Sequence, residues 1–79
     1  MPKYTPMPKL PALRAREVIR LLEGVGFYEV RQRGSHLQLK RGNLLVTIPV
    51  HSGDLNPGTL RSIIRQAGMT VDEFLTLLK

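Results

Sequence analysis

Two histidines are the side chains of this 79-residue sequence best suited to acid–base chemistry. His36 lies at the start of one alternating apolar run, and His51 follows a second one. A neutral imidazole can take a proton from a ribose 2′-hydroxyl, and a protonated imidazole can give one to a leaving oxygen, because histidine ordinarily has a pKa of about 6.5. Cationic side chains nearby would stabilise the charge that builds on the phosphate. The two histidines therefore admit metal-free cleavage of RNA, although an exposed strand histidine without a function fits the same pattern.

Other catalytic chemistries fit the sequence less well. There is no cysteine, and no acidic residue has a convincing ligand spacing to the two histidines, so we expect neither a metal nor a cofactor. Ser35 and His36 are neighbours in a strand and would project to opposite faces, which excludes a nucleophile–base pair. The glycines at 24 and 26 form too short a pattern for a phosphate loop, and they follow a helix rather than a strand.

The charge of the chain favours a polyanionic partner. Twelve Lys and Arg residues against six Asp and Glu residues give a net charge of +6, and the basic excess lies within residues 1–65. Such an excess is typical of nucleic-acid binding, while solubility or an acidic protein partner would account for it as well. No apolar run has the length of a signal peptide or a membrane span, so we expect a cytoplasmic protein with no membrane partner.

Hydrophobic periodicity predicts the order α-β-β-β-α-α, an α+β class with a three-stranded antiparallel sheet and helices on one face. Residues 1–11 are a proline-rich tail, and residues 12–79 form a single domain. A first helix is expected over 14–23, with Val18, Leu21, Leu22 and Val25 on its buried face. The strands are expected at 27–33, 35–40 and 44–50. A second helix starts at Asn56-Pro57 and ends at Gly68, and a capping box of Thr70 and Glu73 opens a short third helix.

The expected register of the second hairpin gives His36 its direction. A two-residue turn at Gly42-Asn43 pairs Leu39 with Val46 and places apolar residues opposite each other. His36 then points to the open face of the sheet opposite Pro49, together with Gln38, Lys40 and Thr47. His51 would be its diagonal neighbour at roughly 7–8 Å if the third strand continues that far. The weak alternation of the first strand leaves open whether Arg31 and Arg33 share this face.

Several stretches together resemble the HicA (YcfA-like) toxin family. They are residues 10–27, the Arg-Gln-Arg-Gly-Ser-His segment at 31–36, the Val-Thr-Ile-Pro-Val-His segment at 46–51, and residues 57–68. The resemblance spans about residues 8–78. It implies a double-stranded-RNA-binding-domain-like fold, the toxin of a type II toxin–antitoxin system that cleaves mRNA independently of the ribosome, and a HicB-type antitoxin as partner. The start of the first helix departs from the family pattern, because Arg14-Ala15 replaces the usual small polar cap.

The resemblance also implies functional residues. It maps the family's catalytic histidine onto His36 and a Pro-x-His segment onto Pro49 and His51, where His51 is a second acid or base, a phosphate contact or only the end of a strand. Gly34 and Ser35 would shape the turn that presents His36. We expect mRNA or another single-stranded RNA to be bound by a set of basic residues, namely Arg31, Arg33, Lys40, Arg41, Arg61 and Arg65. The free protein is expected to be a monomer. A non-catalytic module that binds double-stranded RNA by shape is the alternative reading, and a plain protein-interaction domain is a third.

Overall fold

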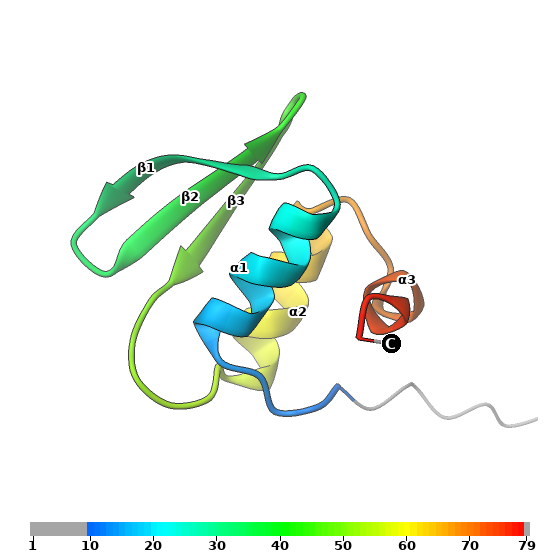
Figure 1. Cartoon of the computed structure of the whole chain (residues 1–79). Helices are drawn as coiled ribbons and strands as arrows, with labels where there is room; N and C mark the ends of the chain where they lie inside the picture. Colours follow the sequence, from blue (N-terminus) through cyan, green and yellow to red (C-terminus); the bar gives the residue numbers. More distant parts are fainter. Residues whose placement is uncertain (1–9, 79) are drawn as a thin grey trace, which may run out of the picture.

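A computed structural model describes residues 10–78 and shows one antiparallel sheet with helices on one side of it (Figure 1). The predicted order of elements and the α+β class are confirmed, and the topology is that of a double-stranded-RNA-binding-like domain. The elements in chain order are α1 (Ala15–Gly24), β1 (Tyr28–Arg33), β2 (His36–Arg41), β3 (Leu44–Pro49), α2 (Pro57–Gln66) and α3 (Val71–Thr76).

Two tight hairpins hold the sheet in the order β1-β2-β3. Each hairpin has a two-residue turn, Gly34-Ser35 and Gly42-Asn43, whose glycine has a positive φ of 57° or 59°. Glycine with positive φ in first place, followed by a residue with negative φ, is the pattern of a type II′ turn, whose twist matches that of the strands. The predicted register between β2 and β3 is confirmed, since Leu39 pairs with Val46 and His36 pairs with Pro49.

A bulge in β1 explains why its sequence alternates so weakly. Glu29 pairs with Leu39 of β2, and Arg31 pairs with Gln38, the residue directly before Leu39. Val30 is therefore the bulged residue and has no partner on β2. The bulge reverses which side chains face the helices, and all six residues of β1 are exposed. Arg31 and Arg33 pair with Gln38 and His36, and paired residues of an antiparallel sheet project to the same face. Both arginines therefore lie on the open face.

The core lies between the sheet and the helices. Leu37, Leu39, Val46 and Ile48 are buried from the sheet, and the helices contribute Ala15, Val18, Leu22, Leu60, Ile63, Ile64, Ala67 and Phe74. Val18 and Leu22 of the stripe predicted for the first helix are fully buried, whereas Leu21 and Val25 of the same stripe are only half-buried. Leu78 lies beyond the last helix, α3, which ends at Thr76, and it is 39% exposed.

Local hydrogen bonds fix the start of α1 and the loop before α2. The Arg14 N–H donates to Oε1 of Glu17 at 2.9 Å, so the glutamate replaces the small polar cap that this helix lacks. The Leu55 N–H donates to the Leu13 carbonyl at 2.8 Å and ties the loop before α2 to this start. Leu10, within the predicted tail, packs against the core, and the rest of the tail up to residue 9 lies outside the described residues.

Candidate active site on the open sheet face

The open face of the sheet consists of three rows of paired side chains. The row nearest the β1–β2 turn is Arg33, His36 and Pro49, and the next is Arg31, Gln38 and Thr47. The third row, at the other end of the sheet, is Tyr28, Lys40 and Leu45. Because the buried Leu37 and Leu39 fix the opposite face, the alternation of β2 places His36, Gln38 and Lys40 together on this surface.

His36 lies in an open hollow of about 270 Å³, which it lines together with Arg31, Arg33 and Gln38. Its side chain is exposed, and its ring has no hydrogen-bond partner among residues 10–78. Both ring nitrogens are therefore free to exchange protons with a bound substrate. Gln38 is held in place on this face, because its Nε2 donates to Oγ1 of Thr47 at 3.4 Å. The hollow brings an acid–base group and two guanidinium groups within reach of one phosphate.

The backbone around His36 positions it at the end of the sheet. The Val50 N–H donates to the Ser35 carbonyl, so this pair is a hydrogen-bonded one, and the next pair, His36 with Pro49, is not. A proline removes no interstrand hydrogen bond at such a position of an edge strand, because a backbone N–H there points away from the neighbouring strand. The Cα atoms of such a pair lie closer together than those of a hydrogen-bonded pair, so Pro49 is a near neighbour of His36 across the two strands. Gly34 and Ser35 form the turn immediately before His36.

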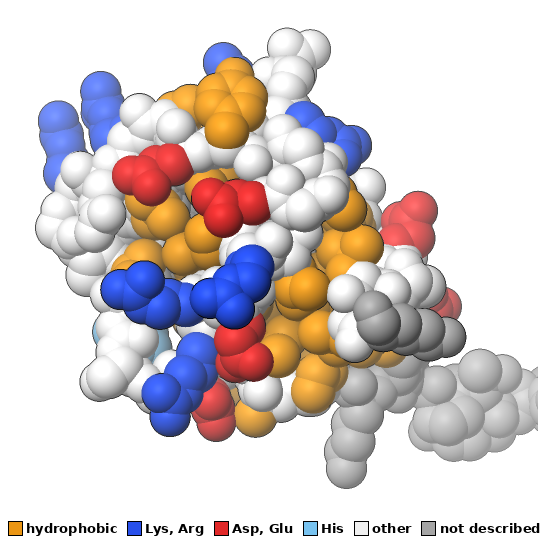
Figure 2. All heavy atoms as spheres, in the orientation of Figure 1, with side chains coloured by type: hydrophobic (Ala, Val, Ile, Leu, Met, Phe, Trp, Pro, Cys, Tyr) orange, Lys and Arg blue, Asp and Glu red, His pale blue; other side chains and the backbone are white. Residues whose placement is uncertain are grey.

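Charge is segregated between the two faces of the sheet. The open face carries the cations Arg31, Arg33 and Lys40 and no carboxylate. All six acidic residues of the sequence lie elsewhere: Glu17 and Glu23 on α1, Glu29 on the helix-facing side of β1, Asp54 in the loop before α2, and Asp72 and Glu73 on α3. On the side that carries α1, Figure 2 shows acidic and basic side chains mixed together. The open face is therefore the surface best suited to a polyanion.

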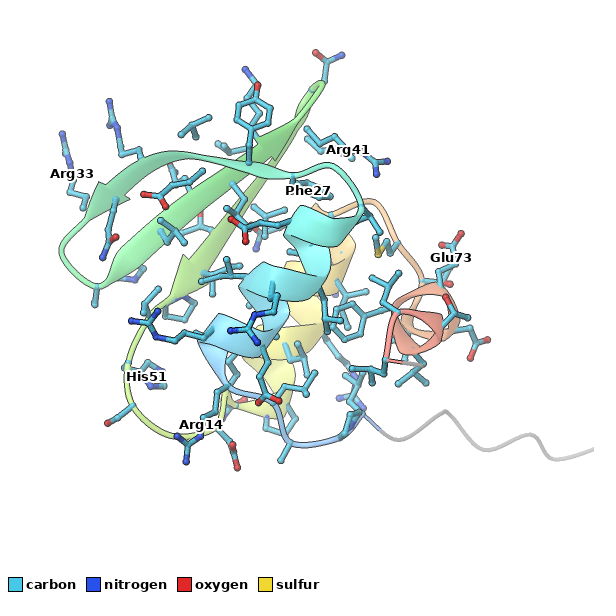
Figure 3. All side chains as sticks on the ribbon, viewed as in Figure 1. Arg14, Phe27, Arg33, Arg41, His51 and Glu73 are labelled. Atoms are coloured by element: carbon cyan, nitrogen blue, oxygen red, sulfur yellow. The ribbon has the colours of Figure 1, made fainter. Side chains whose placement is uncertain are left out.

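His51 does not share the hollow of His36. The strand β3 ends at Pro49, so the third strand does not reach His51, which lies in the loop that follows. There it lines a separate hollow of about 320 Å³ with Arg14, Arg16 and the backbone around Ser52 and Gly53. Figure 3 shows Arg33 on the β1–β2 hairpin and His51 on the loop nearer to Arg14. Nδ1 of His51 is 2.9 Å from the Ser52 carbonyl, which only accepts, so Nδ1 carries the hydrogen and Nε2 is the nitrogen available to a ligand.

Three of the predicted RNA-binding arginines lie away from the open face. Arg41 belongs to the helix-facing side of β2, where its Nη1 donates to the Val25 carbonyl at 2.6 Å and its guanidinium lies 5.3 Å from the centre of the Phe27 ring (Figure 3). Arg61 and Arg65 are exposed on α2, which packs against the helix-facing side of the sheet. The structure thus gathers Arg31, Arg33 and Lys40 around His36 and leaves the other three elsewhere.

A model of a protein family, described as the HicA toxin of bacterial toxin–antitoxin systems, matches residues 15–69 of the chain. The chain belongs to the HicA toxin family. The match covers all three strands, α1 and α2, and therefore includes both histidines and every arginine discussed above except Arg14. HicA proteins are known as toxins that cleave mRNA, and the family implies a cognate antitoxin and an RNA substrate. A comparison with curated proteins found no match.

Two features are absent from the part of the chain that the structure describes. Residues 10–78 contain no group of three or more His, Cys, Asp or Glu side chains placed to hold a metal ion. In the same part of the chain no helix is both long and apolar enough to span a bilayer.

Tyr28 is a feature of the open face that the sequence reasoning missed. It is 54% exposed at the end of the sheet opposite His36. The signal that would have found it is an aromatic residue in a strand whose neighbours are mostly charged, but the bulge at Val30 hides on which face it lies.

Proposed function

We propose that this HicA protein is an endoribonuclease that cleaves single-stranded RNA without a metal, with His36 as its acid–base residue. The observation that carries the proposal is the hollow shared by His36, Arg31 and Arg33 on a face without carboxylates. An imidazole with free nitrogens can move the proton of the 2′-hydroxyl, and the guanidinium groups can stabilise the charge on the phosphate. We further propose that the protein acts on mRNA in the cytoplasm. A cognate antitoxin that covers the open face would stop cleavage, because it would bury His36.

His51 is proposed as a contact for the RNA backbone rather than as the partner of His36 in proton transfer. It faces a hollow that also contains two arginines, and it shares no lining residue with the hollow of His36. A strand of RNA that extends from one hollow to the other would meet Arg14, Arg16 and His51 beyond the scissile phosphate. Substituting His51 by alanine should then raise KM more than it lowers the single-turnover rate, whereas a proton-transfer role requires the opposite split.

The test is incubation of the purified protein with a single-stranded RNA in EDTA. The parent should cleave the RNA, and His36→Ala should be slower by about 10²- to 10⁴-fold, the usual contribution of general acid–base catalysis. Because His36 is exposed, the variant should fold as the parent does, which circular dichroism checks. Intact RNA with both proteins, together with retained binding of double-stranded RNA, would instead establish the non-catalytic module.

A further inference from the structure

The open face extends well past the hollow of His36. Lys40 is four residues along β2 from His36, which corresponds to about 13 Å in a strand. Lys40 pairs with Tyr28 on one side and with Leu45 on the other, and both of these side chains are about half exposed. An aromatic and an aliphatic side chain therefore flank one lysine on the open sheet, where all three are accessible to a ligand.

The chemistry of this row matches the bases and phosphates of a single-stranded nucleic acid. An aromatic ring offers a face on which any base can stack, and an adjacent ammonium group can hold a phosphate. Exposed aromatic residues on an open sheet, next to basic residues, bind unpaired bases of RNA in this way. The three rows run from Arg33 and His36, through Arg31 and Gln38, to Tyr28 and Lys40, with no carboxylate among them. A path of positive charge therefore joins the aromatic residue to the histidine.

We propose that Tyr28 stacks on a base of the single-stranded RNA substrate and that Lys40 binds the backbone beside it. This inference rests on the proposed function and adds a binding site to it. The separation of about 13 Å from His36 means that the stacked base belongs to a nucleotide a few positions from the scissile bond. Tyr28 is thus a substrate-binding residue and touches none of the reacting atoms. A duplex cannot occupy the site in this manner, because its bases are already stacked on one another.

Binding to the His36→Ala protein in EDTA measures the stack without cleavage. With a labelled single-stranded RNA, Tyr28→Ala in this background should weaken binding roughly 5- to 150-fold, the usual effect of removing one base–aromatic stack. Tyr28→Phe keeps the ring and should bind within about twofold of the parent, while Tyr28→Leu keeps apolar surface without a ring and should lose most of the affinity. Unchanged affinity in Tyr28→Ala, or full affinity in Tyr28→Leu, would overturn the proposal.

The length of the substrate provides a readout that a structural role of Tyr28 would not move. In the parent background, Tyr28→Ala should raise KM for RNA that extends several nucleotides on both sides of the cleaved bond. The increase in KM should be much smaller for a dinucleotide, because the dinucleotide cannot reach Tyr28. Equal impairment on both substrates would contradict the stack and indicate a disturbed fold.

The remaining outcomes separate this proposal from others. If the parent cleaves no RNA while the tyrosine series shows the expected loss of binding, the proposed catalysis fails and the stacking site stands. If RNA binding is unaffected by Tyr28→Ala but binding of the cognate antitoxin weakens, the exposed row belongs to a protein interface and the stacking proposal is wrong.

Discussion

At the scale of single residues, the face of the sheet to which an arginine projects determines what it can contact. Arg33 and Arg41 are both exposed and adjoin turns of the same sheet. Arg33 lies beside His36 on the open face, whereas Arg41 projects to the helix side and donates to the Val25 carbonyl just after α1. The carbonyl groups at the end of a helix have no partner within the helix, and a cation is favourable there. We therefore propose that Arg41 stabilises the fold and that Arg33 binds the substrate.

Substitution of these two arginines should have opposite consequences. Arg41→Ala removes a charged hydrogen bond and a cation–π contact with Phe27, and it should lower the free energy of unfolding by about 1–2 kcal/mol, allowing for solvent exposure. Arg33→Ala should leave stability within about 0.5 kcal/mol of the parent and weaken RNA binding. Urea denaturation and RNA titration measure the two effects. A large loss of RNA affinity in a folded Arg41→Ala protein would restore the role that the sequence suggested.

The sequence predicts the face on which a residue lies where apolar and polar residues alternate strongly, and it does not predict which distant residue a side chain contacts. The apolar positions 37, 39, 46 and 48 suffice to place His36 on the open face. The same pattern places Arg41 on the helix-facing side, but its hydrogen bond to Val25 depends on where α1 ends relative to the sheet. Nothing in the local sequence specifies this contact, since it arises from the packing of the whole core.

At the scale of elements, the β1–β2 hairpin sets the position of His36. Gly34 has a φ of +57°, and no atom lies within 4 Å of the place where a Cβ would be added. A side chain there would meet no steric obstacle, so the cost of a substitution comes from the backbone conformation alone. Gly24, the last residue of α1, also has free space, but its φ is not in the left-handed region.

These two glycines form a matched pair for a stability measurement. Gly34→Ala should lower the free energy of unfolding by about 1–2 kcal/mol because alanine is strained at positive φ. Gly24→Ala should instead raise it by up to about 1 kcal/mol, since alanine favours the helix and restricts the unfolded chain. Thermal or urea denaturation of both variants checks the signs. Equal effects would show that the turn does not hold Gly34 in the left-handed region.

The bulge in β1 is a feature that could not be predicted from the sequence. Val30 is the extra residue, and it shifts Arg31 and Arg33 onto the face of His36. The sequence of β1 gives no sign of the bulge. All six residues are exposed, so neither set of alternating residues forms an apolar stripe whose interruption would mark the bulge. The pairing of β2 with β3 was predictable for the opposite reason, since a one-residue slip would have turned its leucines to solvent.

At the scale of the whole molecule, the distribution of charge matters more than the net value of +6. The acidic residues are mixed with basic ones on the side of the helices, whereas the charged residues of the open face are all basic. A polyanion is therefore expected to bind in one orientation, with its backbone along Arg33, Arg31 and Lys40. Overall charge and composition indicated a nucleic acid from the sequence, but only the fold shows which face gathers cations without carboxylates.

The salt dependence of RNA binding should reveal how many of these cations are engaged. The three cations of the open face alone contribute about −2 to the slope of the logarithm of the association constant against the logarithm of salt concentration, and Arg14 and Arg16 add to this slope when the RNA also reaches the hollow of His51. Arg33→Ala should make this slope shallower by about 0.7. Arg61→Ala is the control, because it removes the same charge from α2 and should leave the slope unchanged. The same change with both variants would mean that the RNA senses only net charge.

The central claim is that the imidazole of His36 transfers protons during RNA cleavage, and chemical rescue tests it most directly. Single-turnover cleavage in EDTA would be measured at saturating protein for the parent and for His36→Gly, with and without imidazole in the buffer. We predict that His36→Gly binds RNA as the parent does, cleaves about 10²- to 10⁴-fold more slowly, and recovers part of its rate in proportion to the added imidazole. A His36→Gly protein that cleaves at the parental rate would contradict the account.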